Sequence, residues 1–243
     1  MLEVIEIANA AGSGMTMPFL CRLSDEEFYY VKGRSLTCDG LVNEYIGAHL
    51  GRLLSLPIPE FEIAQLPDLS IFPEDENSPR SLGFGQVFAS KRVPNLDDLD
   101  HSLIEQVPAE LRRDVAVFDY WVGNEDRTLT ETGGNPNLFW DVSGSCLTVF
   151  DHNLAFSDEY SLENALELHP FRVDLLEVLS DDASKAKYAT RFLGVLTQWT
   201  QICSMIPDDW LFKDMGQTIE AEIDFQRRLE RLKILCEPEG WGK

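Results

Sequence analysis

The sequence predicts an α+β protein in two lobes, a small, mainly β lobe with one helix and a larger, mainly helical lobe. Short β-type segments dominate residues 1–92, helical periodicity dominates after residue 108, and one hairpin interrupts the helical part. The lobes are therefore expected to cover residues 1–92 and 93–243. A chain of 243 residues with 44% hydrophobic content is long enough for one large domain or two small lobes.

Alternating and apolar segments predict the strands of the first lobe, at residues 2–7, 19–23, 27–31, 60–66 and 84–90. A turn with Gly12, Ser13 and Gly14 follows the first of them. Glycine turns joined to strands can cover phosphates with backbone N–H groups, although an ordinary structural turn has the same composition. After the third strand, the apolar periodicity predicts a helix over residues 41–55 with Asp39 as its N-cap.

Lys32 stands at the end of the third strand, where period-two alternation places it on one face with Phe28 and Tyr30. A lysine on an apolar strand face is costly to bury without a partner. Glu44 lies twelve residues further on, in the predicted helix, and we expect it to pair with Lys32. The alternative is that Lys32 ends an edge strand and Glu44 faces water.

Helical periodicity predicts the helices of the second lobe, at residues 109–122, 170–179, 183–206 and 217–235. Pro108 precedes the first of them, at a position that favours helix initiation. Their apolar stripes are interpreted as core, and the basic run at 227–233 as a solvated face.

The segment 119–156 contains three polar clusters with apolar residues on either side. These clusters are 124–127 (NEDR), 135–137 (NPN) and 151–153 (DHN). The second precedes a strand-like LFW run, and the third follows a strand-like LTVF run. An Asp after a helix, an Asn before a strand and an Asp after the next strand would meet at one edge of a hairpin. Such a group is what Mg-nucleotide chemistry needs.

This segment resembles the catalytic segment of the HipA-like kinases and, more distantly, that of the type II phosphatidylinositol 4-kinases. In both families an N-x-D-R stretch is followed by an Asn before a strand and an Asp after the next strand. Here these places are taken by Asn124, Asp126, Arg127, Asn137 and Asp151. The resemblance implies a two-lobed protein-kinase-like fold, in a compact form without the additional N-terminal subdomain of longer members. It also implies transfer of the γ-phosphate of ATP to a protein serine or threonine, with Mg²⁺.

The same resemblance implies catalytic roles for four residues. Lys32 would contact nucleotide phosphates, and Glu44 would position Lys32. Asp126 would orient the acceptor hydroxyl, and Arg127 would either support the phosphoryl group or pair with a nearby carboxylate.

The resemblance further implies that Asn137 and Asp151 hold Mg²⁺. The loop after Asp126 is longer than usual in the family, which leaves Asn135 as the alternative amide ligand. Two segments are expected to present backbone groups to the nucleotide. Gly12, Ser13 and Gly14 would contact the phosphates, and Phe88, Ala89 and Ser90 would contact the adenine.

Two other functions stay open. The lengthened loop and minimal glycine turn favour a catalytically silent pseudokinase that serves as a nucleotide-binding interaction module. The NEDR and FDHNLAF stretches favour a lipid kinase of the phosphatidylinositol type. The expected partners are a protein substrate and an inhibitory partner protein, as in a toxin–antitoxin pair.

The composition is strongly acidic, with 20 Lys and Arg against 42 Asp and Glu and a net charge of −22. Such a surface repels phosphate backbones and anionic lipids, so neither direct nucleic-acid binding nor membrane binding is expected. The five cysteines include no C-x-x-C pair, which is typical of free thiols in a reducing compartment. With no signal-peptide pattern and no apolar run near about 18 residues, we expect a cytoplasmic protein.

Overall fold

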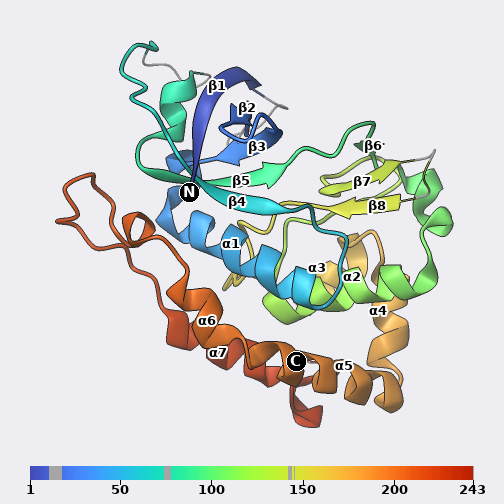
Figure 1. Ribbon diagram of the computed structural model, residues 1–243. Coiled ribbons are helices and arrows are strands. Elements are labelled where there is room, and N and C mark those ends of the chain that lie inside the picture. Colours follow the sequence, from blue (N-terminus) through green and yellow to red (C-terminus); the bar gives the residue numbers. More distant parts are fainter. Residues whose placement is uncertain (11–17, 74–77, 142–143, 145, 243) are drawn as a thin grey trace. The chain divides into compact units, whose positions relative to one another are not determined.

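The computed structural model describes residues 1–10, 18–73, 78–141, 144 and 146–242. It confirms the predicted α+β class, because strands dominate the first part of the chain and helices the later part (Figure 1). The chain divides into two compact units. Unit 1 comprises Met1–Tyr45, Pro59–Pro94 and Ile206–Ile223, and unit 2 comprises Ile46–Ile58, Asn95–Met205 and Asp224–Lys243. Both units combine segments that are distant in sequence, whereas the predicted division follows the chain.

Unit 1 is built on a closed barrel with the strand order β1-β2-β3-β5-β4. Its strands are β1 (Leu2–Ala10), β2 (Phe19–Leu23), β3 (Phe28–Lys32), β4 (Phe61–Gln65) and β5 (Gln86–Lys91). The neighbours pair antiparallel except β1 and β4, which run parallel with Leu2 opposite Ala64 and close the sheet. All the predicted strands of this region are present with slightly shifted ends.

The barrel encloses an apolar core that decides which face of β3 is buried. Tyr29 and Val31 belong to this core together with residues of the other strands and loops. Because side chains alternate along a strand, Lys32 lies on the opposite face of β3 from the barrel core. The sequence shows the period-two alternation of β3. Which of its two faces the core covers depends on how the barrel closes.

Helix α1 (Thr37–Leu53) starts earlier than predicted. The Thr37 hydroxyl accepts a hydrogen bond from the Gly40 N–H, at 3.2 Å, and so satisfies one of the free donors of the first turn. The prediction of Asp39 as N-cap was therefore wrong, because Asp39 lies inside that turn. There the negative charge of its carboxylate still interacts favourably with the positive end of the helix dipole.

Residues 206–223, which include the short helix η4 (Asp208–Leu211), return to unit 1 from the far part of the chain. Trp210 is fully buried and donates its Nε1–H to the Gln86 carbonyl at 2.8 Å. Its ring meets that of Tyr45 edge-on, with centroids 5.9 Å apart. The return segment thus packs against both β5 and α1.

Unit 2 is mainly helical, and its helices are α2 (Ala109–Val122), α3 (Leu162–Leu168), α4 (Arg172–Leu179), α5 (Asp182–Leu196), α6 (Trp199–Ser204) and α7 (Phe225–Ile234). The bounds of α2 match the prediction, and Gly123 ends the helix in a left-handed conformation, with φ 66°. The helix predicted over 183–206 is divided into α5 and α6. The helix predicted over 217–235 was wrong in its first part, because α7 begins only after Asp224 caps it.

Unit 2 also contains an antiparallel sheet in the order β6-β7-β8. Its strands are β6 (Asp97–Asp98), β7 (Leu138–Asp141) and β8 (Cys146–Val149), so the predicted hairpin is present. The remaining short 3₁₀ helices are η1 (Arg34–Leu36), η2 (Pro79–Leu82), η3 (His101–Gln106) and η5 (Pro238–Gly240). Across the described residues, every helix is too short or too polar to span a lipid bilayer.

The burial of Trp210 yields a first prediction. Trp210→Ala removes the indole from between β5 and α1 and should lower the free energy of unfolding by about 3–5 kcal/mol. Urea unfolding measures this loss. Met215→Ala, in the same return segment but 74% exposed, is the control and should change stability by about 0.5 kcal/mol or less. Equal midpoints for the two variants would show that the return segment does not stabilise unit 1.

Candidate functional site

Lys32 and Glu44 form the expected strand-to-helix ion pair in unit 1. The Lys32 Nζ lies 2.9 Å from Glu44 Oε2, and the side chains are 11% and 5% exposed. Withdrawing two charges from water costs free energy that such a pair regains only with good geometry and further hydrogen bonds. A pair of this kind is therefore weak evidence for stability and is compatible with a functional role.

The residues predicted to contact an adenine belong to a strand in the wall of the barrel. Phe88, Ala89 and Ser90 belong to β5, which pairs with β3 on one side and with β4 on the other. In a central strand both ladders use the backbone N–H and C=O groups. The backbone of these residues therefore takes part in the pairing of β5 with β3 and β4, and their contact with an adenine stays a prediction.

The predicted phosphate-covering residues Gly12, Ser13 and Gly14 lie outside the described residues. The two strands on either side, β1 and β2, pair antiparallel up to Ala10 opposite Phe19.

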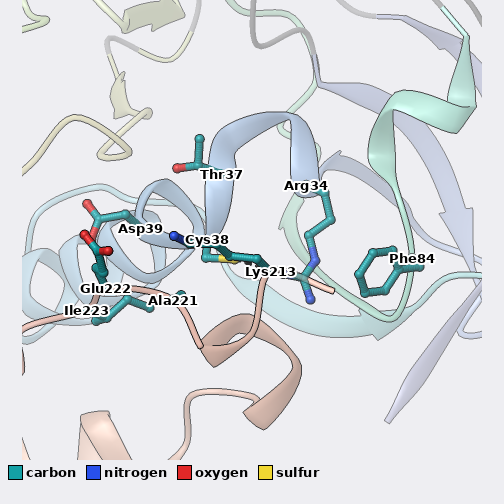
Figure 2. Close-up of a pocket in the computed structure, with 9 residues that line it drawn as sticks. All are labelled: Arg34, Thr37, Cys38, Asp39, Phe84, Lys213, Ala221, Glu222 and Ile223. Carbon is teal, nitrogen blue, oxygen red and sulfur yellow. Dashed lines mark hydrogen bonds between the residues drawn. The ribbon is translucent and has the colours of Figure 1, made fainter. Parts of the chain in front are cut away.

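Unit 1 also holds a cavity of about 430 Å³ at the first turn of α1 (Figure 2). Its walls come from α1, the η1 region, the loop before β5 and the return segment, through Arg34, Thr37, Cys38, Asp39, Phe84, Lys213, Ala221, Glu222 and Ile223. Arg34 is fixed there, with its guanidinium 4.6 Å above the Phe84 ring and Nη1 donating to the Phe212 carbonyl at 2.7 Å. Among the described residues, none of those predicted to contact the nucleotide lines this cavity.

In unit 2, Asp126 is surrounded by amide groups. Its Oδ2 accepts hydrogen bonds from Asn135 Nδ2 at 3.0 Å and from Asn137 Nδ2 at 2.9 Å. Because an ionised carboxylate only accepts, the nitrogen of each amide faces Asp126 and each amide oxygen faces elsewhere. Burial raises the pKa of the Asp126 carboxyl, against the lowering effect of the two amides, and nearby Asp151 raises it further.

Asn137 and Asp151 occupy corresponding positions at one end of the β7–β8 hairpin. Asn137 directly precedes β7 and Asp151 follows β8, and the N–H of Phe150 donates to the Asn137 carbonyl at 3.2 Å. Both have left-handed backbones, with φ 46° at Asn137 and 60° at Asp151. Non-glycine residues in this region are uncommon and gather at functional sites. The hairpin thus brings together the two predicted metal ligands.

Arg127 is buried and ties these segments together. Its Nε donates to Asp119 Oδ2 at 2.6 Å, and its side chain is 0% exposed. Its Nη1 donates to the carbonyls of Pro136 at 3.0 Å and Asn137 at 2.7 Å, with a longer contact to Phe150 at 3.4 Å. Of the two predicted roles for Arg127, the structure shows the pairing with a carboxylate.

Asp119 is the residue of this site that the sequence reasoning missed. It lies in α2, is 1% exposed, and accepts hydrogen bonds from Arg127, His169 and Asn124. Burial acts to raise the pKa of Asp119, but Arg127 and His169 outweigh it and hold that pKa well below its usual range. A carboxylate in the apolar face of a helix was the available signal, since such a group requires buried partners.

The donor atoms around Asp126 suit a hard cation. The amide oxygen of Asn137 and the carboxylate of Asp151 are oxygen ligands, and Mg²⁺ is bound through one or two carboxylates together with substrate phosphates. In the part of the chain that the structure describes, no three His, Cys, Asp or Glu side chains gather as a metal site. The oxygen atoms of Asn137 and Asp151 fit the kind of ligand that Mg²⁺ takes together with a nucleotide.

The model of the HipA-like kinase family matches residues 4–243 and confirms the resemblance carried by the catalytic segment. Among solved structures, the chain is similar to the proinflammatory kinase CtkA of Helicobacter pylori. The identity is 14% and the TM-score 0.48, over 95% of this chain and 90% of that one. A comparison with curated proteins finds no match.

The burial of Arg127 predicts a large effect of its removal. Arg127→Met leaves the Asp119 carboxylate without its cation and should lower the free energy of unfolding by about 3–5 kcal/mol. Arg113→Met is the control, because Arg113 is 39% exposed and pairs with Glu177 at the surface, where an ion pair contributes about 1 kcal/mol or less. Urea unfolding compares the two, and a loss at Arg127 as small as that at Arg113 would contradict the structural role.

The lowered pKa of Asp119 predicts a pH-dependent difference between wild type and Asp119→Asn. The unfolded Asp titrates near its ordinary value of about 3.9, so the stability from the ionised pair is fully present above about pH 4. It is lost as the pH falls below that value toward the folded pKa. The stability difference between the two proteins in urea should therefore narrow below about pH 4. A constant difference from neutral to acid pH would contradict an ionised Asp119.

Proposed function

We propose that this chain, which belongs to the HipA-like kinase family, transfers the γ-phosphate of ATP to a serine or threonine hydroxyl of a protein. The observation that carries the proposal is the buried Lys32–Glu44 pair, with Nζ and Oε2 2.9 Å apart. A strand lysine held by a helix glutamate is the group that binds nucleotide phosphates in kinases. In this proposal Lys32 binds the phosphates, and Glu44 keeps its ammonium group in place.

A two-lobed kinase-like fold is part of the proposal. Unit 1, with its barrel and the start of α1, corresponds to the small lobe, and unit 2, with α2 to α7, corresponds to the large lobe. A protein substrate and a separate inhibitory protein, both in the cytoplasm, are the partners that we expect.

Asp126 is proposed to orient the acceptor hydroxyl and to accept its proton. The hydrogen bonds from Asn135 and Asn137 fix the direction of its carboxylate. Burial favours the protonated form of the group, which makes Asp126 a better proton acceptor than an exposed carboxylate. Arg127 binds backbone carbonyl groups and the Asp119 carboxylate, and so we assign it a role in positioning the other residues of the site.

Asn137 and Asp151 are proposed as the residues that hold Mg²⁺. We prefer Asn137 to Asn135 because Arg127 fixes the Asn137 carbonyl and the hairpin fixes its backbone, while Asn135 is exposed in the lengthened loop. Bound Mg²⁺ would neutralise charge on the β- and γ-phosphates. The chain's own contribution is a rigid pair of oxygen ligands beside Asp126.

Paired variants separate nucleotide binding from phosphate transfer. Mg-ATP at 100 times its Kd should stabilise the wild type by about 2.7 kcal/mol in a thermal-shift titration, because it binds only the native state. Asp151→Ala should lose the Mg-dependent part of this shift. Asp126→Asn should keep the shift but lose about 10²–10⁴-fold in phosphate transfer, while Glu131→Gln, an exposed change in the same loop, serves as the control.

The outcomes of this experiment distinguish the candidate functions. A wild type without any Mg-ATP shift would contradict the nucleotide site. If Asp126→Asn binds Mg-ATP and keeps every activity of the wild type, the chain is a nucleotide-binding interaction module instead. Transfer to phosphatidylinositol vesicles in place of protein would identify a lipid kinase.

A further inference from the structure

A second pocket, which lies in unit 2, borders the loop that carries Asp126. Its volume is about 200 Å³. The residues before and after Asp126 form one wall, and the start of α3 forms another. We name it the α3 pocket, and the lining residues that matter here are Asn124, Glu125, Thr128, Tyr160, Ser161 and Asn164.

The α3 pocket contains a buried acceptor without a donor. Asn124 is 2% exposed, and its Nδ2 donates to Asp119 at 3.0 Å. Since Asp119 already binds Arg127 and His169 and can only accept, the Asn124 amide cannot be turned around. Its Oδ1 is then left buried without a hydrogen-bond partner in the described structure. Such an atom costs free energy until an N–H or O–H group reaches it.

The charge of the pocket is set by Glu125. This exposed carboxylate accepts a hydrogen bond from the Ser157 hydroxyl at 2.7 Å, and among the described residues no basic side chain forms an ion pair with it. Arg127 and His169 also line the pocket. The charge of Arg127 is balanced by Asp119, and burial lowers the pKa of His169 and favours its neutral form. The remaining charge in the wall is negative.

The chain segment that contributes Tyr160, Ser161 and Asn164 to the pocket is also acidic, through side chains that do not line the pocket itself. Residues 157–168 contain four carboxylates and no lysine or arginine, and all four are exposed: Asp158, Glu159, Glu163 and Glu167. Arg227 pairs with Asp158, and Arg231 stacks over Tyr160, 5.3 Å from the ring centroid. Two arginines against five carboxylates, counting Glu125, leave the region with a negative charge.

We propose that the α3 pocket binds a lysine or arginine side chain that flanks the phosphoryl acceptor in a polypeptide substrate. An ammonium or guanidinium group carries the N–H donors that Asn124 Oδ1 lacks and the charge that complements Glu125. Residues on both sides of Asp126 line the pocket, so one peptide can reach Asp126 with its hydroxyl and the pocket with a neighbouring side chain. The inference rests on the proposed function and narrows its acceptor to hydroxyls beside basic residues.

The test uses serine peptides that differ only in arginine or citrulline at one flanking position, because citrulline has nearly the shape of arginine without its charge. With Mg-ATP, the wild type should show a kcat/KM about tenfold higher for arginine at one of these positions. Glu125→Gln should reduce this preference toward equality. Glu167→Gln removes the same charge from exposed α3 surface outside the pocket and should keep the preference.

Equal kcat/KM values for the arginine and citrulline peptides in the wild type would overturn the proposal. If no peptide is phosphorylated, anisotropy of the same labelled peptides with the Mg-ADP complex tests the pocket separately. Tighter binding of arginine peptides that is lost in Glu125→Gln would support the pocket and contradict phosphate transfer to such peptides. Equal binding of both peptides would overturn the pocket whatever the enzyme's activity.

Discussion

The ion pair between Arg127 and Asp119 is the interaction on which the polar cluster of unit 2 depends. One planar guanidinium donates to a helix carboxylate and to the carbonyls of Pro136 and Asn137. A lysine could not replace it, because an ammonium group lacks the fixed fork of donors. The pair thus couples α2, the Asp126 loop and the start of β7. Precise placement of this kind is what phosphoryl transfer requires, since its catalysis is mainly positioning and charge stabilisation.

The same network has consequences on both sides of the Asp126 loop. Asp126 itself is held by Asn135 and Asn137, whose amide nitrogens point to its carboxylate. The residue two positions earlier, Asn124, has its nitrogen directed at Asp119 and its oxygen left without a donor. Asp119 therefore organises the proposed metal side of the loop through Arg127 and the proposed substrate side through Asn124.

In unit 1 the charged pair depends on packing from a distant part of the chain. Glu44 is held in α1 next to Tyr45, and the Tyr45 ring contacts Trp210 of the return segment. Residues near the end of the chain thus help to place a helix near its beginning. This connection is consistent with the place of residues 206–223 in unit 1.

The sequence by itself determined what depends on local pattern: the strands of unit 1, the extent of α2, the hairpin, and the N-x-D-R motif with the family to which it belongs. Alternation and helical periodicity are short-range signals, so they survive without knowledge of the fold. Only the tertiary structure decided three features. They are the face of β3 that packs against the core, the pairing of β5 with a strand on each side, and the choice of Asp119 as the partner of Arg127. Those outcomes depend on barrel closure and on contacts between residues far apart in sequence, and no local pattern encodes the partner of a buried charge.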